Sequence, residues 1–173
     1  MSFSSISQSE ILTPQKTAAY NKEHVVVPNH IRLISTEAFS RKNKIKSIEL
    51  PSGLTAIHAR AFQQCQSLQE VCLPHSVEIL GKESFSKCAN LKKVYISNHL
   101  TEIQRNTFQE DKQLRSVLFT PKSQLKSIQR EAFFECTSLE KMLLPHKLTF
   151  IGDRAFYRCK SLSRVRFPEG LTH

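Results

Sequence analysis

The sequence lacks the residues and patterns on which several kinds of protein depend. It has no tryptophan, only four glycines, and no apolar run near the length of a membrane-spanning helix. It has no CxxC or HxxxH pair for a metal and no glycine-rich loop for a phosphate, and we find no nucleophile placed beside a base. We therefore expect no membrane insertion, no cofactor, no metal and no enzymatic activity.

The N-terminal stretch from Met1 to Lys16 has no basic region followed by an apolar region, so it does not resemble a secretory signal. On that ground the expected compartment is the cytoplasm. If the sequence is a fragment of a longer protein, the expectation changes to the cell surface. The net charge of +10 favours acidic partners without naming one.

A repeat dominates what is present. One phenylalanine column recurs at intervals of 23 residues, with a single interval of 25 between Phe108 and Phe133. Its members are Phe39, Phe62, Phe85, Phe108, Phe133 and Phe156. A fixed period of this length in a leucine-rich chain is typical of a solenoid. The longer interval is explained by an insertion in the loop after Thr120, where extra residues are tolerated.

Other columns follow the phenylalanines in phase. An aliphatic residue stands six positions later, as Leu68 does after Phe62, and the ninth and eleventh positions are also apolar, as are Val71 and Leu73. That alternation predicts a short strand, which a proline such as Pro74 ends. The "AFxxC" segment has the three-residue offset of a tight helical turn. No repeat buries this apolar set alone, so the coils must stack.

The consensus "LxxVxLPxxLxxIgxxAFxxCxs" resembles the BspA-type leucine-rich repeat family. The resemblance covers residues 23–173. Asp111 stands where a cysteine is expected, and His58, Gln104 and Gln129 stand where the family has glycine. The resemblance implies an α/β leucine-rich repeat solenoid, with a parallel concave β-sheet and short helical or 3-10 turns on the convex side. It also implies a surface adhesin that binds host-cell or matrix proteins.

The expected organisation is a tail or partial cap over residues 1–22 and about six repeats over residues 23–173, truncated at the C-terminal end. Within the tail, Ile6, Ile11 and Leu12 are candidates for a short amphipathic cap. Four cysteines share one column, three positions after phenylalanine. We expect a ladder of buried thiols there rather than disulfides or a metal site. These cysteines are Cys65, Cys88, Cys136 and Cys159.

The candidate binding site is the outward side of the predicted strands. Ten positions after phenylalanine, four consecutive repeats place Cys72, Tyr95, Leu118 and Leu143 where solvent is expected. Such patches mark interaction sites, although strand propensity alone also accounts for these residue types. Basic residues surround the column and predict a protein partner with an acidic surface. They are Lys92, Lys93, Arg115, Lys141, Arg164 and Arg166.

Two alternatives stay open. The charge also fits a nucleic acid or another anionic surface, but the stacking motifs and recognition helix of nucleic-acid modules are absent, so this partner is less favoured. Phe134 and Tyr157, neighbours in the column after phenylalanine, form either a second contact site or a packing surface for a further repeat.

Overall fold

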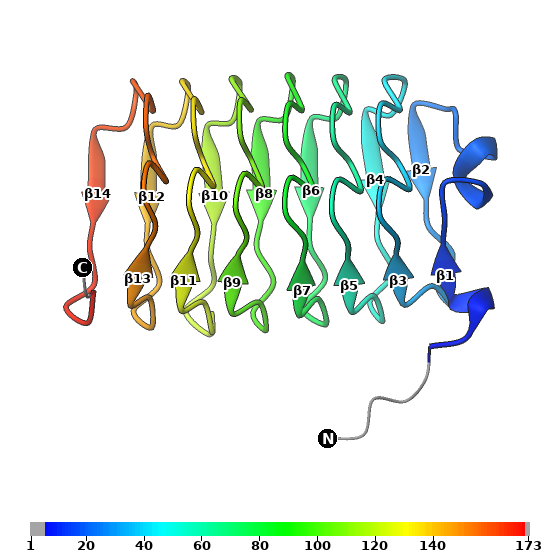
Figure 1. The fold of residues 1–173 in the computed structure, drawn as a ribbon, viewed down its shortest axis with the longest axis horizontal. Helices are drawn as coiled ribbons and strands as arrows, with labels where there is room; N and C mark the ends of the chain where they lie inside the picture. The colour runs from blue at the N-terminus through cyan, green and yellow to red at the C-terminus, as the bar shows by residue number, and fades with distance from the viewer. Residues whose placement is uncertain (1–5, 172–173) are drawn as a thin grey trace.

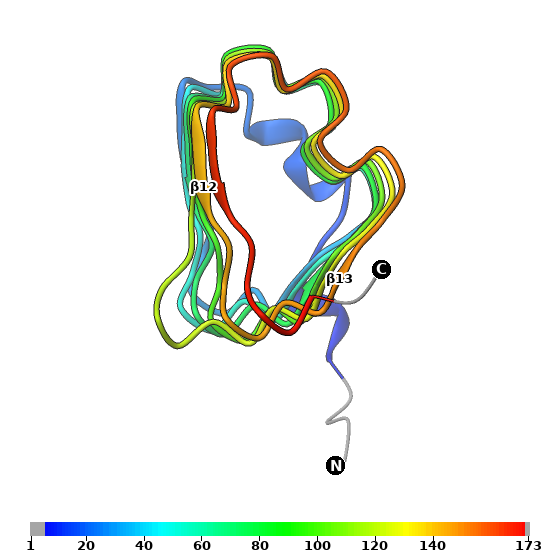
Figure 2. The ribbon, with the colours of Figure 1, turned by 90° about the vertical axis from the view of Figure 1, so that its left-hand side faces the viewer.

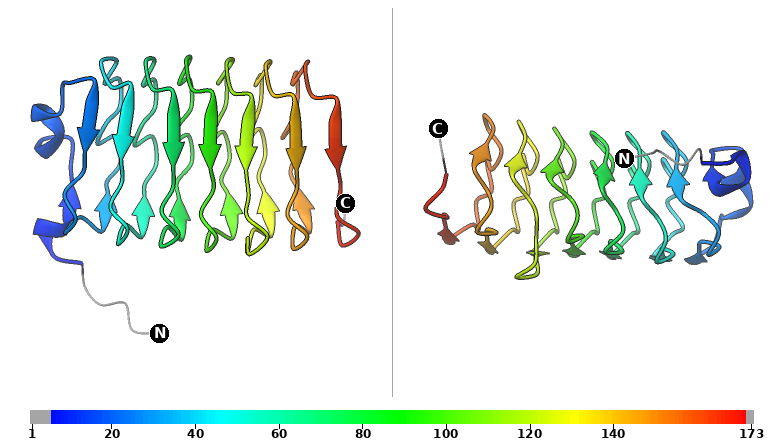
Figure 3. Two further views of the ribbon diagram at one scale, coloured as in Figure 1. Left: turned by 180° about the vertical axis from the view of Figure 1, so that it is seen from behind. Right: turned by 90° about the horizontal axis from the view of Figure 1, so that it is seen from below.

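The computed structural model describes residues 6–171 and shows a row of stacked coils. The coils follow one another in an almost straight line from the N-terminal to the C-terminal end (Figures 1 and 3). Each coil passes through two strands and a set of turns before entering the next coil (Figure 2). The predicted leucine-rich repeat solenoid is confirmed. Of the expected bounds 1–22 and 23–173, residues 1–5 and 172–173 lie outside the described part.

The larger sheet is parallel and has one strand from each coil. Its strands lie in the order β14-β12-β10-β8-β6-β4-β2, so that each pairs with the strand one coil away. Neighbouring coils are in phase because the repeat brings equivalent residues opposite each other, as Val71 and Val94 are. The strands are β2 His24–Val26, β4 Ser47–Glu49, β6 Glu70–Cys72, β8 Lys93–Tyr95, β10 Ser116–Leu118, β12 Lys141–Leu143 and β14 Arg164–Arg166.

A second side of the solenoid has two-residue parallel strands in two separate sheets. One sheet has β1 Ile11–Leu12, β3 Leu33–Ile34, β5 Ala56–Ile57 and β7 Ile79–Leu80, and the other has β9 Glu102–Ile103, β11 Ser127–Ile128 and β13 Phe150–Ile151. The second residue of each strand is apolar and faces the core. The ladder of this side is interrupted between β7 and β9.

The third side is built from the "AFxxC" segments, which form single turns. The Cys65 amide donates to the Phe62 carbonyl over 3.2 Å, three residues back. The turns do not extend into helices, because Arg60 and Gln64 have positive φ angles of 57° and 59°. These left-handed residues aim their amides at the next coil, as Gln64 donates to the Ser86 carbonyl over 2.8 Å. Within residues 6–171, the 3-10 helices are η1 Gln8–Glu10 and η2 Lys16–Ala19.

The core is the phenylalanine column surrounded by aliphatic side chains. Phe62 and Phe85 are fully buried, and their rings stack with centroids 5.0 Å apart. Stacking continues along the whole column to Phe156, which is only partly buried because no described coil covers it. The predicted burial of the column is therefore confirmed from Phe39 to Phe133.

The N-terminal residues cover the first coil. Leu12 is buried in the core cluster, and Thr17 is fully buried and donates to the Ala38 carbonyl. The Tyr20 ring meets Phe39 edge to face, with centroids 5.9 Å apart. Figure 1 shows η2 lying beyond β2 at this end. The apolar core is thus closed at its N-terminal end.

Candidate functional site

The outer face of the seven-stranded sheet contains the residues that the sequence nominated. In each three-residue strand the middle side chain faces the core, while the first and third face outward, as the exposed–buried–exposed pattern of β6 shows. The third positions form one register-aligned column, in which Cys72 pairs with Tyr95 and Tyr95 with Leu118. Leu143 continues this column, since Ser116 pairs with Lys141 two positions earlier. We call Cys72, Tyr95, Leu118 and Leu143 the apolar column.

The members of the apolar column differ in exposure. Leu143 is 74% exposed and Leu118 is 39% exposed, whereas Tyr95 is half-buried. Cys72 is an exposed free thiol. A further exposed apolar side chain on this face is Val26 on β2. The sequence did not nominate it, because its repeat is incomplete. Glu49 on β4 lies between Val26 and the apolar column.

Tyr95 is partly covered by a cation. The Lys93 ammonium lies 5.3 Å from the centroid of the Tyr95 ring, within the range of a cation–π interaction. The tyrosine hydroxyl, followed by the Glu70 carboxylate, raises the pKa of Lys93 above its ordinary value. Lys93 therefore stays charged over the physiological range and places a positive charge at the centre of the face.

The nominated basic residues lie beside the apolar column, and most of them are exposed. The acidic residues of this face beside the column are Glu70 and Glu140, and Glu49 lies at the end of the column next to Cys72. Lys46 also faces outward, but it is neutralised by Glu23, whose carboxylate lies 2.8 Å from the lysine nitrogen. The net positive charge is therefore concentrated on strands β8 to β14. Its sources are Lys92, Lys93, Arg115, Lys141, Arg164 and Arg166.

The cysteine column lies along the inside of the solenoid. Each thiol donates to the carbonyl of a phenylalanine in the preceding coil, as Cys65 does to Phe39 over 3.0 Å. Burial raises the pKa of the Cys65 thiol to about 12 and that of Cys159 to about 11, so both stay protonated at neutral pH. The predicted ladder of buried thiols is confirmed for Cys65, Cys88 and Cys136, while Cys159 is half-buried.

Asp111 interrupts that column and is fully buried. One of its carboxyl oxygens, Oδ1, accepts a hydrogen bond from the Cys88 amide over 2.8 Å. The other, Oδ2, has no hydrogen-bond partner among residues 6–171. Burial raises the pKa of Asp111 well above its ordinary value, so the carboxyl stays protonated in the folded protein.

The second aromatic pair lies on the side of the turns. Phe134 and Tyr157 stack with their centroids 5.4 Å apart, and the Arg158 guanidinium lies 5.4 Å from the Tyr157 ring centroid. Arg158 is also paired with Glu135 at 2.7 Å. The rings stack on each other and on this paired arginine, and Tyr157 remains 47% exposed, so the second contact site and the packing surface for a further repeat both stay predictions.

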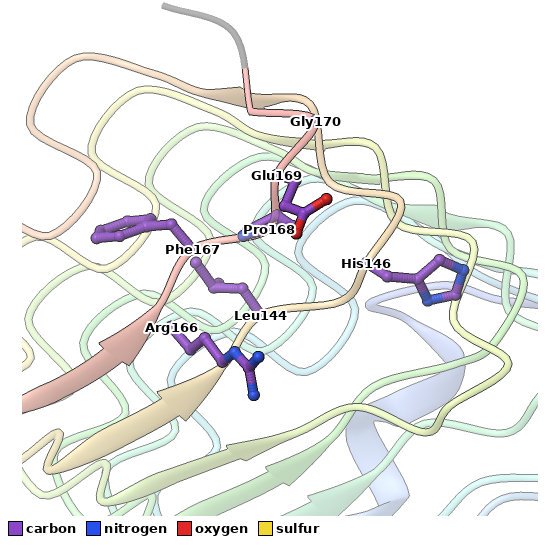
Figure 4. A pocket seen from close by; sticks show the side chains of 7 residues that line it. All are labelled: Leu144, His146, Arg166, Phe167, Pro168, Glu169 and Gly170. Atoms are coloured by element: carbon purple, nitrogen blue, oxygen red, sulfur yellow. The ribbon is translucent and has the colours of Figure 1, made fainter.

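An open hollow of about 370 Å³ lies at the last coil, among the residues that Figure 4 labels. The ring of Phe167 points away from His146 and Arg166 there, so these side chains do not converge on one point (Figure 4). Among residues 6–171, no group of three or more His, Cys, Asp or Glu side chains is placed to hold a metal. The same residues contain no helix long and apolar enough to cross a membrane.

The fold defines a repeat protein of the leucine-rich solenoid class. A family model described as the BspA type leucine rich repeat region matches residues 17–124 and 118–173 with six copies, and the chain belongs to this family. Members of the family are typically non-catalytic and generally act as protein-interaction or surface-adhesin modules. A comparison with curated proteins finds no match.

Solved structures of bacterial repeat proteins are similar to this chain. The leucine-rich repeat protein TpLRR of T. pallidum is 32% identical with a TM-score of 0.76, over 82% of this chain and 65% of that one. A leucine-rich repeat protein of Bacteroides ovatus is 25% identical with a TM-score of 0.67, over 87% of this chain and 44% of that one. This chain thus spans less than two thirds of the length of each.

Proposed function

We propose that the protein is a non-enzymatic interaction module that binds a protein with an acidic surface through the outer face of its seven-stranded sheet. The observation that carries the proposal is the apolar column itself. Four neighbouring strands place apolar side chains side by side in positions where a solvated sheet needs none. Core packing does not account for them, because the core is filled by the middle residue of each strand.

The basic residues beside the apolar column define the chemistry of the partner. Complementary charge steers a partner to its site and excludes wrong partners, whereas the apolar contacts supply most of the affinity. Tyr95 lies near the centre of the column with Lys93 over its ring. A central aromatic with a basic surround is an arrangement in which a few residues dominate the binding energy.

The test compares captured proteins and measured affinities for Tyr95→Ala and the wild type. We expect the substitution to weaken partner binding by about 2 kcal/mol, roughly thirtyfold. Its thermal unfolding should be unchanged, since the side chain lies outside the core. Tyr157→Ala is the comparison variant, because it removes an exposed tyrosine from the alternative contact site on another side.

The proposal fails if Tyr95→Ala retains every protein that the wild type and Tyr157→Ala retain. Salt separates the proposed partner from a nucleic acid. Binding that survives about 0.5 M salt indicates apolar contacts, whereas binding to a polyanion collapses steeply as salt rises.

A further inference from the structure

The members of the apolar column repeat at the spacing between strands. The column runs perpendicular to the strands, and neighbouring strands of a sheet lie about 4.8 Å apart. Because the coils form an almost straight row (Figure 1), the column from Cys72 to Leu143 is close to linear and about 14 Å long. A partner that contacts all four residues must therefore present an apolar group about every 4.8 Å along a line.

An α-helix meets this requirement. A helix rises about 1.5 Å per residue, so apolar residues spaced alternately three and four apart recur about every 5.2 Å. Over three intervals the mismatch with the column is roughly 1 Å, which side chains absorb. An extended segment lying along the same line repeats its apolar face about every 6.7 Å and is out of step by about 6 Å over the same three intervals.

We propose that the partner presents an amphipathic α-helix that lies across strands β6 to β12, with its apolar stripe on Cys72, Tyr95, Leu118 and Leu143 and acidic residues along one flank. This inference rests on the proposed function and names the element of the partner that the sheet recognises.

The positions of the basic residues on the sheet indicate which flank of the partner helix is acidic. Lys93 and Lys141 each stand two residues before the column member of their own strand. Arg115 stands three residues before Leu118. They therefore lie on the side where the strands begin. Glutamates or aspartates on that flank of the helix face these three cations, which outnumber Glu70 and Glu140, the two acidic residues on the same side of the column.

The insertion after β10 borders the column on the other side. Figure 2 shows this loop projecting beyond the sheet further than the equivalent loops of the other coils. Its backbone is tied down, since Gln124 donates to the Asn98 carbonyl over 2.9 Å and Ser123 is buried. The loop thus borders the column next to Leu118, on the side opposite the basic residues.

Three labelled peptides of about 18 residues test the inference by fluorescence anisotropy, since that length spans the column. The first has leucines at alternating spacings of three and four residues with glutamates beside them. The second has the same composition with leucines at every second residue. The third replaces the glutamates of the first with lysines. We expect the first to bind at least tenfold more tightly than the others and to gain helical circular dichroism on binding.

Protein variants place the peptide on the sheet. Leu118→Asp should weaken binding of the first peptide at least tenfold, whereas Ile79→Asp, which changes an exposed apolar residue on another side, should not. Thermal denaturation of both variants checks that the fold is kept.

Three results would refute the proposal that the partner presents a helix. They are equal or tighter binding of the second peptide, insensitivity of the first peptide to Leu118→Asp, and no binding of the first peptide up to about 1 mM. If the second peptide binds and loses affinity with Leu118→Asp, the sheet remains the binding face and only the helix is wrong. If Leu118→Asp leaves every peptide unaffected and Tyr95→Ala retains every captured protein, the proposed function fails as well.

Discussion

Replacing Asp111 should stabilise the protein, and the gain should grow with pH. The carboxyl is fully buried, and its Oδ2 lacks a partner. A buried unsatisfied polar group costs about 1–3 kcal/mol. In Asp111→Asn the amide oxygen keeps the bond from the Cys88 amide. The asparagine side chain does not titrate, so this variant removes the pH dependence, although its NH₂ group occupies the same unpartnered position as Oδ2. Asp111→Cys restores the residue of the column, whose other members donate to the phenylalanine carbonyl of the preceding coil.

The pH dependence follows from the raised pKa of Asp111. The unfolded chain releases this proton near its ordinary pKa of about 3.9, whereas the folded chain holds it. The stability that depends on this proton is complete below the unfolded pKa and is lost as the pH rises toward and through the folded pKa. Within that window the free energy of unfolding falls by about 1.4 kcal/mol per pH unit relative to a chain without the group.

Urea denaturation of wild type, Asp111→Asn and Asp111→Cys between about pH 4 and pH 8 measures the difference. Asp153→Asn is the control for removing an acid, because the Asp153 carboxylate is exposed to solvent. We expect the two Asp111 variants to gain on the wild type as the pH rises and the control to run parallel to it. A stability difference that does not change with pH would refute the assignment of a buried, protonated carboxyl.

Two further predictions concern packing, and both are read from denaturant unfolding. Phe85→Ala should cost about 3–5 kcal/mol, because it empties the middle of the stacked column, while the half-buried Phe156→Ala should cost less; equal costs would contradict the stacking order. Gly81→Ala should cost about 1–3 kcal/mol, since a Cβ there would lie 2.4 Å from the Ala59 backbone nitrogen. Gly170→Ala, with nothing within 4 Å, should be neutral; a neutral Gly81→Ala would show that the backbones are not in contact.

The core was predictable because each repeat must bury an apolar side chain at the same positions. The interval of 23 residues is enough to locate the phenylalanine and cysteine columns in the sequence, and Asp111 is visible there as a break in the cysteine column. The first coil was harder to detect. Ile11 pairs with Leu33, an offset of 22 rather than 23, so the strand that begins the second side falls out of phase with the repeat.

The left-handed turns were not predictable from composition. Glycine or asparagine is the usual sign of a positive φ, but Glu37 and Arg60 adopt it here. Their amides donate to the next coil, as Glu37 donates to the Ala59 carbonyl over 3.1 Å, and these bonds between coils offset the local strain. The two-residue alternation predicts which side chains lie on the outer face. It does not predict that they bind a partner, so their binding role is a proposal.

Three irregularities of the chain meet at one interface, between the coils of Phe85 and Phe108. The ring centroids there are 5.8 Å apart, whereas those of Phe62 and Phe85 are 5.0 Å apart. The pairing of two-residue strands on the second side is interrupted between β7 and β9. Asp111 also breaks the cysteine column at this place. Stability in a stacked repeat is close to a sum of interface terms, so the solenoid separates most readily here. The seven-stranded sheet continues across it, where Tyr95 pairs with Leu118. A partner lying along the apolar column bridges the interface that we expect to be the weakest. Binding that needs both coils in place stabilises their contact in proportion to the occupancy of the site.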